Sequence, residues 1–279
     1  MFRAAAVRSP MGRAMARYST VSTPASQVYS NANAVPLVRT DFDAAKRIWT
    51  LHFLGQETPD HRLTHSMIQQ GLLPALRDVR RQWNEWSKAN DTEQGAALVT
   101  TAPLDSKIFS NGLDLLKAVR DPHFFNDCLN ALSRELLTFP IPTVAAVGGH
   151  AFAAGCTLAL AHDYRVMNSK RGYMCMNEIE FGAPIPSGML GVIQSVATKA
   201  AQRKLLLEAH RFTAHEAEAY GLVHATAEGP EATLDKALAI AAQVQSRAAK
   251  GAWQSIKESL NADALAMQYE PPRAAPLFP

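Results

Sequence analysis

The sequence predicts an α/β protein in which short buried strands alternate with helices, followed by a mostly helical C-terminal part. Two runs, AALVTTA (96–102) and TVAAVGG (143–149), are typical of strands buried on both faces of a sheet, and YRVMN (164–168) is expected to be a further short strand. Helical patterns separate these runs, and such regular succession indicates α/β layers. After PIPSG (184–188) we expect helices to about residue 262, with GLVHAT (221–226) as a single strand.

The elements before this core follow from their own patterns. VPLVRTDF (35–42) and RIWTLHFL (47–54) are rich in β-formers and flank a short polar turn, which predicts a hairpin. From residue 64 to about residue 86, apolar residues recur at three- and four-residue steps, as in an amphipathic helix. Gly71 and Pro74 argue against an unbroken rod there.

The remaining elements are short. PLDSKIFSNG (103–112) is expected to be a loop, a helix is expected near 122–138, and YMCMN (173–177) is expected to be another strand. No internal repeat of fixed period is present.

Composition excludes several classes of function. The 279 residues carry a net charge of +3, and four arginines without any acidic residue lie in the first 17 positions, so the remainder is close to neutral. A nucleic-acid or membrane-surface role therefore has no electrostatic support. No apolar run approaches the length of a membrane-spanning helix, so we expect no stable membrane insertion.

Cys128, Cys156 and Cys175 form no metal-ligand pattern and are expected to be buried, reduced thiols.

The N-terminus is predicted to be a targeting segment. Residues 1–26 are rich in Arg, Ala and Ser, lack Asp and Glu, and have no continuous apolar stretch, which is typical of a mitochondrial transit peptide. An uncleaved tail is the alternative. We expect three regions: a transit peptide and linker (1–34), a core (35–205) and a C-terminal helical region with a tail (206–279). The location expected is the mitochondrial matrix, with the peroxisome as the alternative.

Four segments in fixed order carry a resemblance to a known family. AALVTTA is followed by FSNGLDL (109–115), by IPTVAAVGGHAFAAGCTLALAHDY (141–164) and by MNEIEFGAPIP (176–186), and a weaker match extends through 204–226. Together they resemble the crotonase, or enoyl-CoA hydratase/isomerase, superfamily, particularly its plant-type 3-enoyl-CoA isomerases. The resemblance implies a spiral of ββα units that forms two roughly perpendicular sheets, with a C-terminal helical part.

The resemblance also implies how the thioester of an acyl-CoA would be held. Its carbonyl oxygen would accept hydrogen bonds from the main-chain N–H groups of Leu113 and Ala154, which stabilise the negative charge that develops there. Small residues at Ala153, Ala154 and Gly155 would let the thioester approach the backbone. Tight packing of a helix against a strand would require small residues equally well.

One position departs from the family's hydratases. Thr157 stands where those enzymes carry the first of two glutamates that activate water, whereas the second position matches Glu178. A single carboxylate is what an isomerase needs, because one base can remove a proton and return it elsewhere. The apolar neighbours of Glu178 would raise its pKa. Glu180 is a competitor, since in an extended strand it would share a face with Glu178. Thr157 itself is expected to bond to a carbonyl one turn earlier.

Further substrate contacts are implied by position in the motifs. The residues expected to bind substrate are Ser110, Asn111, Asp114, Leu115, Gly155 and Lys257. Asp114 could instead cap a helix, and Lys257 could reach the CoA phosphates of a neighbouring subunit or be an exposed helix lysine. Ser110 lacks the GxSxG context of a hydrolase nucleophile. His52, His150 and His162 have no partner at ligand spacing and are expected to be satisfied structural residues.

The resemblance therefore implies an isomerase that converts 3-enoyl-CoA to 2-trans-enoyl-CoA in the β-oxidation of unsaturated fatty acids. No metal or other cofactor is expected, because coenzyme A is part of the substrate. A homotrimer or a dimer of trimers is implied, and no nucleic-acid partner. The alternatives are another acyl-CoA enzyme on the same scaffold, such as a hydratase or thioesterase, and a non-catalytic CoA-binding subunit.

Overall fold

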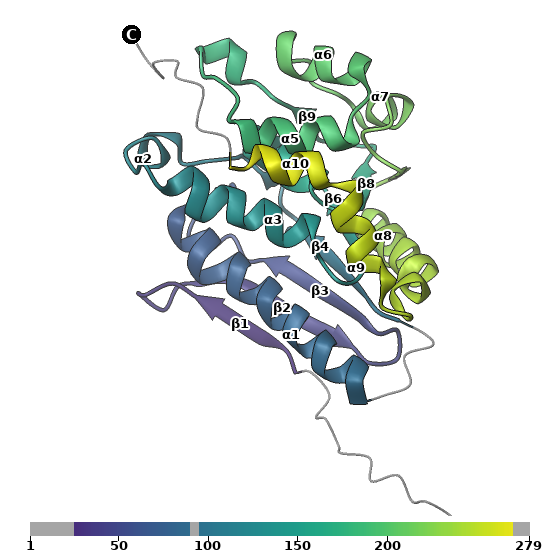
Figure 1. Cartoon of the computed structure of the whole chain (residues 1–279). Helices are drawn as coiled ribbons and strands as arrows, with labels where there is room; N and C mark the ends of the chain where they lie inside the picture. Colours follow the sequence, from purple (N-terminus) through teal and green to yellow (C-terminus); the bar gives the residue numbers. More distant parts are fainter. Residues whose placement is uncertain (1–24, 90–94, 270–279) are drawn as a thin grey trace, which may run out of the picture.

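The structure is a computed structural model that describes residues 25–89 and 95–269. It contains a seven-stranded sheet and a three-stranded sheet (Figure 1). The large sheet has the strand order β1 (Gln27–Ser30), β2 (Pro36–Asp43), β3 (Ile48–Phe53), β4 (Ala97–Thr101), β6 (Thr143–Val147), β8 (Tyr164–Asn168) and β10 (Ala225–Ala227). The small sheet has the order β5 (Ile108–Ser110), β7 (His150–Phe152) and β9 (Met174–Cys175).

Pairing within the large sheet confirms the predicted hairpin. Strands β2 and β3 are antiparallel, with Val38 opposite Phe53 and Asp43 opposite Ile48. From β3 onward each strand pairs in parallel with the next one in the sheet. Parallel neighbours require a crossover between them, which is why helices separate these strands in the sequence.

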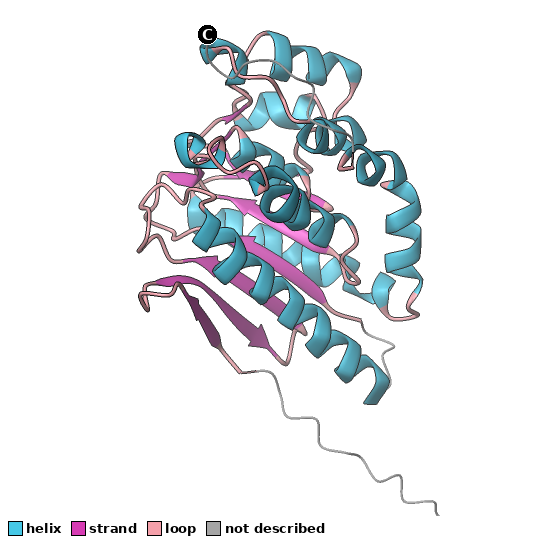
Figure 2. Ribbon diagram, turned by 60° about the vertical axis from the view of Figure 1, so that its left-hand side comes forward, coloured by secondary structure: helices cyan, strands magenta, loops and turns pink. Residues whose placement is uncertain are grey.

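The helices enclose the large sheet on both faces (Figure 2). They are η1 (Met67–Leu72), α1 (Leu73–Ala89), α2 (Leu115–Ala118), η2 (Phe124–Asn130), α3 (Ala131–Leu137), α4 (Ala154–Leu160), η3 (Glu178–Phe181), α5 (Ser187–Val196), α6 (Lys199–Leu207), α7 (Ala214–Ala219), α8 (Pro230–Val244), η4 (Gln245–Ala248), α9 (Ala252–Leu260) and α10 (Ala262–Met267). In β4, Ala97 and Val99 pack with α8, whereas Leu98 belongs to the larger core on the opposite face.

The first helical run is continuous from η1 into α1. A π-helical turn over 67–72 passes directly into the α-helix, so Gly71 and Pro74 do not break it. Gly71 has another effect: a Cβ there would lie 3.1 Å from the Cβ of Leu37 on β2, which is tighter than an ordinary contact. The helix can therefore lie close against the sheet.

Strand β1 corrects the prediction that residues 1–34 form only a transit peptide and linker. Residues 27–30 pair antiparallel with β2, and Tyr29 is buried beneath the first helical run. The Tyr29 hydroxyl donates to Asp78, 3.1 Å away. One buried side chain among exposed polar neighbours is too weak a pattern to predict a strand. The predicted transit peptide lies largely outside the described residues.

The boundary predicted at residue 205 does not separate independent units. Strand β10 from the C-terminal region extends the large sheet beside β8, and α8 covers one face of it. Helix α10 packs on α5. No helix in the described part of the chain is long and apolar enough to cross a membrane.

Candidate active site

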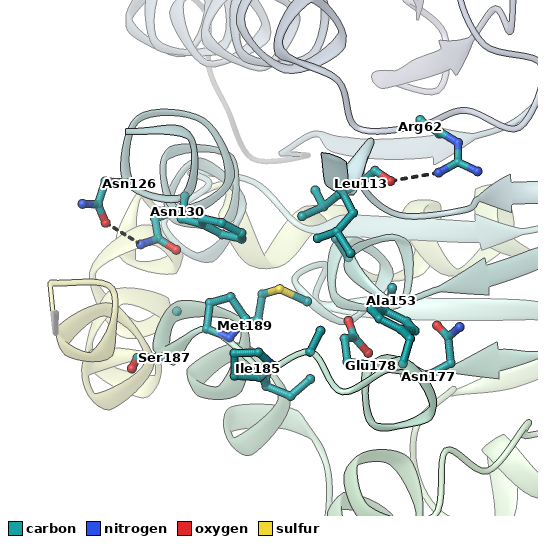
Figure 3. Close-up of a pocket in the computed structure, with 18 of the residues that line it drawn as sticks. Arg62, Leu113, Asn126, Asn130, Ala153, Asn177, Glu178, Ile185, Ser187 and Met189 are labelled. Atoms are coloured by element: carbon teal, nitrogen blue, oxygen red, sulfur yellow. Dashed lines mark hydrogen bonds between the residues drawn. The ribbon is translucent and has the colours of Figure 1, made fainter. Parts of the chain in front are cut away.

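A cavity of about 670 Å³ lies between the loop after β5, the start of α4 and the segment from η3 to α5 (Figure 3). Apolar side chains such as Phe125, Ile185 and Met189 form much of its wall. Of the predicted site residues, the cavity brings together Glu178, Leu113, Ala154, Asn111 and Leu115. The Asn111 side-chain amide donates to Asp60 (3.1 Å), which holds this loop in place.

Glu178 is a buried carboxylic acid facing this cavity. Its exposed fraction is 7%, and its Oε2 atom has no hydrogen-bond partner within the described residues. Burial raises the pKa of Glu178 to about 7, because the apolar surroundings disfavour the ionised form. A carboxyl group with such a pKa is close to half ionised at neutral pH, which suits a general base.

The structure separates Glu178 from Glu180, which sequence alternation could not do. Residues 178–181 form the 3-10 turn η3, so the alternation of an extended strand does not apply to them. Glu178 therefore points inward, whereas Glu180 is exposed and lies 3.8 Å from Arg211. The left-handed Gly182 ends the turn.

Leu113 and Ala154 both line the cavity. Helix α4 begins at Ala154, so this N–H has no acceptor within the helix. Within the described part of the chain, neither amide donates to another residue. Two unused N–H groups on residues that line one cavity are available to stabilise an oxyanion that develops there.

The two segments that carry these amides touch each other. A Cβ at Gly112, whose φ is +78°, would lie 2.9 Å from the carbonyl oxygen of Phe152 and 3.2 Å from the nitrogen of Ala154. Ala153, just before α4, has φ 52° and ψ −125°, which is a strained conformation for a residue with a side chain. Close packing therefore fixes the positions of both donors.

Arg62 was not predicted, although it supports the first donor. Its Nη1 atom donates to the carbonyl oxygen of Leu113 (3.0 Å), and its Nε atom pairs with Asp60 (2.9 Å). The amide of Leu63 donates to Gly112 (2.8 Å). Arginine is common in sequences, so nothing marks Arg62 as a site residue. Only folding brings it against Leu113, which lies 51 residues further along the chain.

Thr157 behaves as expected. It is buried, its hydroxyl donates to the carbonyl of Ala153 at 3.5 Å, and its Oγ1 lies 3.7 Å from the sulfur of Met176. It does not line the cavity.

Four predicted substrate contacts lie away from the cavity wall. Ser110 is fully buried and donates to the carbonyl of His61 (2.8 Å), so it shapes the loop. Gly155 is small because a Cβ there would lie 2.2 Å from the carbonyl oxygen of Ser110, so packing and not substrate approach requires it. Asp114 occupies the N-cap position of α2 without a side-chain capping bond, and it pairs with Lys117 (2.9 Å).

Lys257 is the fourth, and it is not the exposed helix lysine that was one of the two expectations. It is only 4% exposed, and its Nζ lies 2.8 Å from Asp163, which also accepts from the amide of Thr143 (2.8 Å). This buried ion pair attaches α9 to the core, and a contact with the CoA phosphates stays a prediction.

The histidine and cysteine predictions are largely confirmed. His162 is buried, with Nδ1 against the carbonyl of Leu158 and Nε2 against the hydroxyl of Thr100, each at 2.9 Å. His52 pairs with Asp41 at 3.1 Å. His150 is the exception, because its Nδ1 atom is buried without a partner among the described residues. Cys128, Cys156 and Cys175 are buried free thiols.

Comparison with known sequences places this geometry in a family. The model of the enoyl-CoA hydratase/isomerase family matches residues 85–274. The peroxisomal enoyl-CoA delta isomerase 1 of Arabidopsis thaliana is 32% identical over 68% of this chain and 80% of its own length. Enoyl-CoA delta isomerase 3 of the same plant is 36% identical over 57% of this chain and 71% of its own length. A probable mitochondrial enoyl-CoA hydratase of Dictyostelium discoideum is 27% identical over 61% of this chain and 59% of its own length.

Solved structures agree with the sequence comparison. An enoyl-CoA isomerase of Mycobacterium tuberculosis superimposes with a TM-score of 0.68 at 26% identity, over 83% of this chain and 93% of that one. The crotonase-like α/β fold predicted from the sequence is thereby confirmed. The chain belongs to the enoyl-CoA hydratase/isomerase family and is an enzyme of that family.

Proposed function

We propose that the protein isomerises 3-enoyl-CoA to 2-trans-enoyl-CoA, with Glu178 as the single base. The observation that carries this proposal is one buried, unpartnered carboxyl group in the same cavity as two unused main-chain donors. Relatives that are named enoyl-CoA delta isomerases support it.

The chemistry requires one proton to move. The ionised Glu178 removes a proton from C2, and the electron pair of the C–H bond passes to the thioester oxygen, giving a dienolate. The amides of Leu113 and Ala154 donate to that oxygen. Glu178 then returns the proton to C4, the thioester carbonyl re-forms, and the double bond lies between C2 and C3. No electron is gained or lost, so the proposed step requires neither a metal nor a redox cofactor.

The cavity wall favours an isomerase over a hydratase. Glu178 is the only carboxyl group among the described residues that line it. Thr157 occupies the position at which the resemblance implies a second glutamate in hydratases, and its hydroxyl is directed to Ala153 and Met176. The carboxylate pair that would hold a water molecule is therefore missing at this position.

The role, location and assembly of the enzyme are part of the same proposal. The pathway is the β-oxidation of unsaturated fatty acids. The composition of the first 26 residues favours the mitochondrial matrix, although the relatives include peroxisomal and mitochondrial proteins. Imaging of a fusion tagged at the C-terminus tests the location, and a peroxisomal signal would reject the matrix.

We expect a homotrimer or a dimer of trimers. Ile256 and Leu260 are separated by one turn of α9 and expose 66% and 80% of their surface. Contact with another subunit would remove this apolar surface from water. Light scattering on the purified protein measures the mass, and a monomer would contradict the proposal.

The activity is tested by two assays in parallel. Ultraviolet absorbance detects the conjugated thioester that forms from a 3-enoyl-CoA, and a second assay measures hydration of a 2-enoyl-CoA. Isomerisation that exceeds hydration supports the proposal. Hydration without isomerisation indicates a hydratase, release of free coenzyme A indicates a thioesterase, and binding without turnover indicates a non-catalytic subunit; each of these results overturns it.

A further inference from the structure

The N-terminus of α5 opens into the cavity. Ser187, Gly188 and Met189 are the first three residues of this ten-residue helix, and all three line the cavity. Their N–H groups have no acceptor within the helix. The preceding residue, Pro186, has no side chain that could accept from them, and no side-chain cap is present.

The Ser187 hydroxyl adds a second unused polar group. Ser187 is only 6% exposed, it lines the cavity, and its Oγ has no hydrogen-bond partner among the described residues. Ser195, near the other end of α5, is different, because its hydroxyl donates to the carbonyl of Val192 (2.9 Å). The Ser187 hydroxyl is therefore free to bond to a group that enters the cavity.

Asn130 supplies an acceptor at the same place. Its side-chain amide nitrogen donates to the carbonyl of Gln268 (3.0 Å) and to the side chain of Asn126 (3.4 Å), which fixes the orientation of the group. The carbonyl oxygen Oδ1 of Asn130 consequently lies against Gly188, where a Cβ would be 2.1 Å from it. Asn130 is 6% exposed and lines the cavity.

These polar groups are separated from the proposed base. In Figure 3, Asn130 and Ser187 lie on the side of the cavity away from Glu178, with Met189 and Ile185 between them in this view. The wall between Leu113 and Ala154 and these polar groups is largely apolar, so an acyl chain that follows it from a thioester at Leu113 and Ala154 would end beside Asn130 and Ser187.

We propose that this end of the cavity binds a hydroxyl group on the acyl chain, so that the substrate class is a hydroxylated 3-enoyl-CoA. A hydroxyl oxygen can accept from Ser187 and the first amides of α5, while its proton is donated to Oδ1 of Asn130. A carboxylate would be attracted by the helix N-terminus, but it cannot donate to that oxygen and would be repelled by it. The inference rests on the proposed isomerase function.

The experiment compares 3-enoyl-CoA thioesters of equal length that differ only in a hydroxyl placed at successive carbons beyond C4. For each, the ratio of kcat/KM to that of the unsubstituted thioester is measured in the wild type, in Ser187→Ala and in Ser195→Ala. At one position we expect a ratio above one, which falls roughly 3- to 10-fold in Ser187→Ala and is unchanged in Ser195→Ala.

Calorimetric Kd values for saturated acyl-CoA and hydroxyacyl-CoA separate this inference from the proposed function. Tighter binding of the hydroxylated thioester supports the polar site even if no isomerisation occurs. Absence of isomerisation would then reject the proposed isomerase function but not the polar site. Ratios at or below one at every position, or equal ratios in both serine variants, overturn the inference. A higher ratio for a terminal carboxylate than for any hydroxyl also overturns it and indicates an anion site.

Discussion

The carbonyl oxygen of Ser110 occupies the space that a side chain at Gly155 would need, 2.2 Å from the ideal Cβ position. Ser110 ends β5 and Gly155 lies in the first turn of α4, so this contact joins the two segments that carry the Leu113 and Ala154 amides. The separation of the two donors depends on a residue that does not itself line the cavity.

The Gly155→Ala substitution is therefore expected to displace one donor segment from the other. Overpacking of this kind typically costs about 1–3 kcal/mol of unfolding free energy, and kcat should fall along with it. Denaturant unfolding and isomerase kinetics measure the two effects. Gly148→Ala is the matched control, because its Cβ would meet only Pro230 at an ordinary 3.6 Å. Equal behaviour of the two variants would contradict this role of Gly155.

The Glu178→Gln substitution removes the proposed base with little change in shape. We expect kcat to fall roughly 10²- to 10⁴-fold, because the amide cannot take up the C2 proton. The Kd for acyl-CoA, measured by calorimetry, should change little. Glu180→Gln is the control, since this exposed carboxylate lies outside the cavity. Normal turnover by Glu178→Gln, or a comparable loss in Glu180→Gln, would reassign the base.

The rate should depend on pH through the ionisation of Glu178. Its pKa is raised to about 7, and only the ionised form can accept a proton. We therefore expect kcat/KM to rise with pH up to about 7 and to level off above it. A profile that is already flat from pH 5 would show that the base titrates elsewhere.

The same ionisation affects stability in the opposite direction. The pKa of Glu178 is higher in the folded state than the ordinary value of 4.5, so the folded protein loses stability as the pH rises from about 4.5 through about 7. Glu178→Gln does not titrate. Its unfolding free energy relative to the wild type should therefore increase over this window and remain constant above it.

The Lys257→Met substitution tests the assignment of this lysine to the fold. Removal of one partner leaves Asp163 unpaired near the core, which should cost roughly 3–5 kcal/mol of unfolding free energy. KM for the acyl-CoA should not change. Lys204→Met, which breaks the surface pair with Glu208, should cost less than about 1 kcal/mol. A raised KM with unchanged stability would instead favour a role at the CoA phosphates.

The large sheet was predictable wherever a strand is buried on both faces. The runs that became β4 and β6 are buried along their whole length and contain no charged residue, so composition alone identifies them. Strands β5 and β7 have three residues each, too few for any periodicity, and they are defined by their pairing in the small sheet.

In the candidate site, too, some residues could be predicted from the sequence and others could not. Glu178 was found because its motif has a fixed register with the segments before it. Arg62, Asn130 and Ser187 were missed, since their significance depends on partners that only the fold brings near. Asn130 donates to the carbonyl of Gln268, 138 residues further along the chain. No local pattern contains such a contact.

The backbone conformation of Ala153 implies a conflict between heat tolerance and catalytic speed. Glycine adopts its angles, φ 52° and ψ −125°, more readily than alanine, so Ala153→Gly would relieve about 1–3 kcal/mol of strain. The melting temperature should rise, while the looser backbone aims the next amide less accurately and turnover slows. If the melting temperature and the turnover rate rose together, the strained backbone at Ala153 would have no catalytic role.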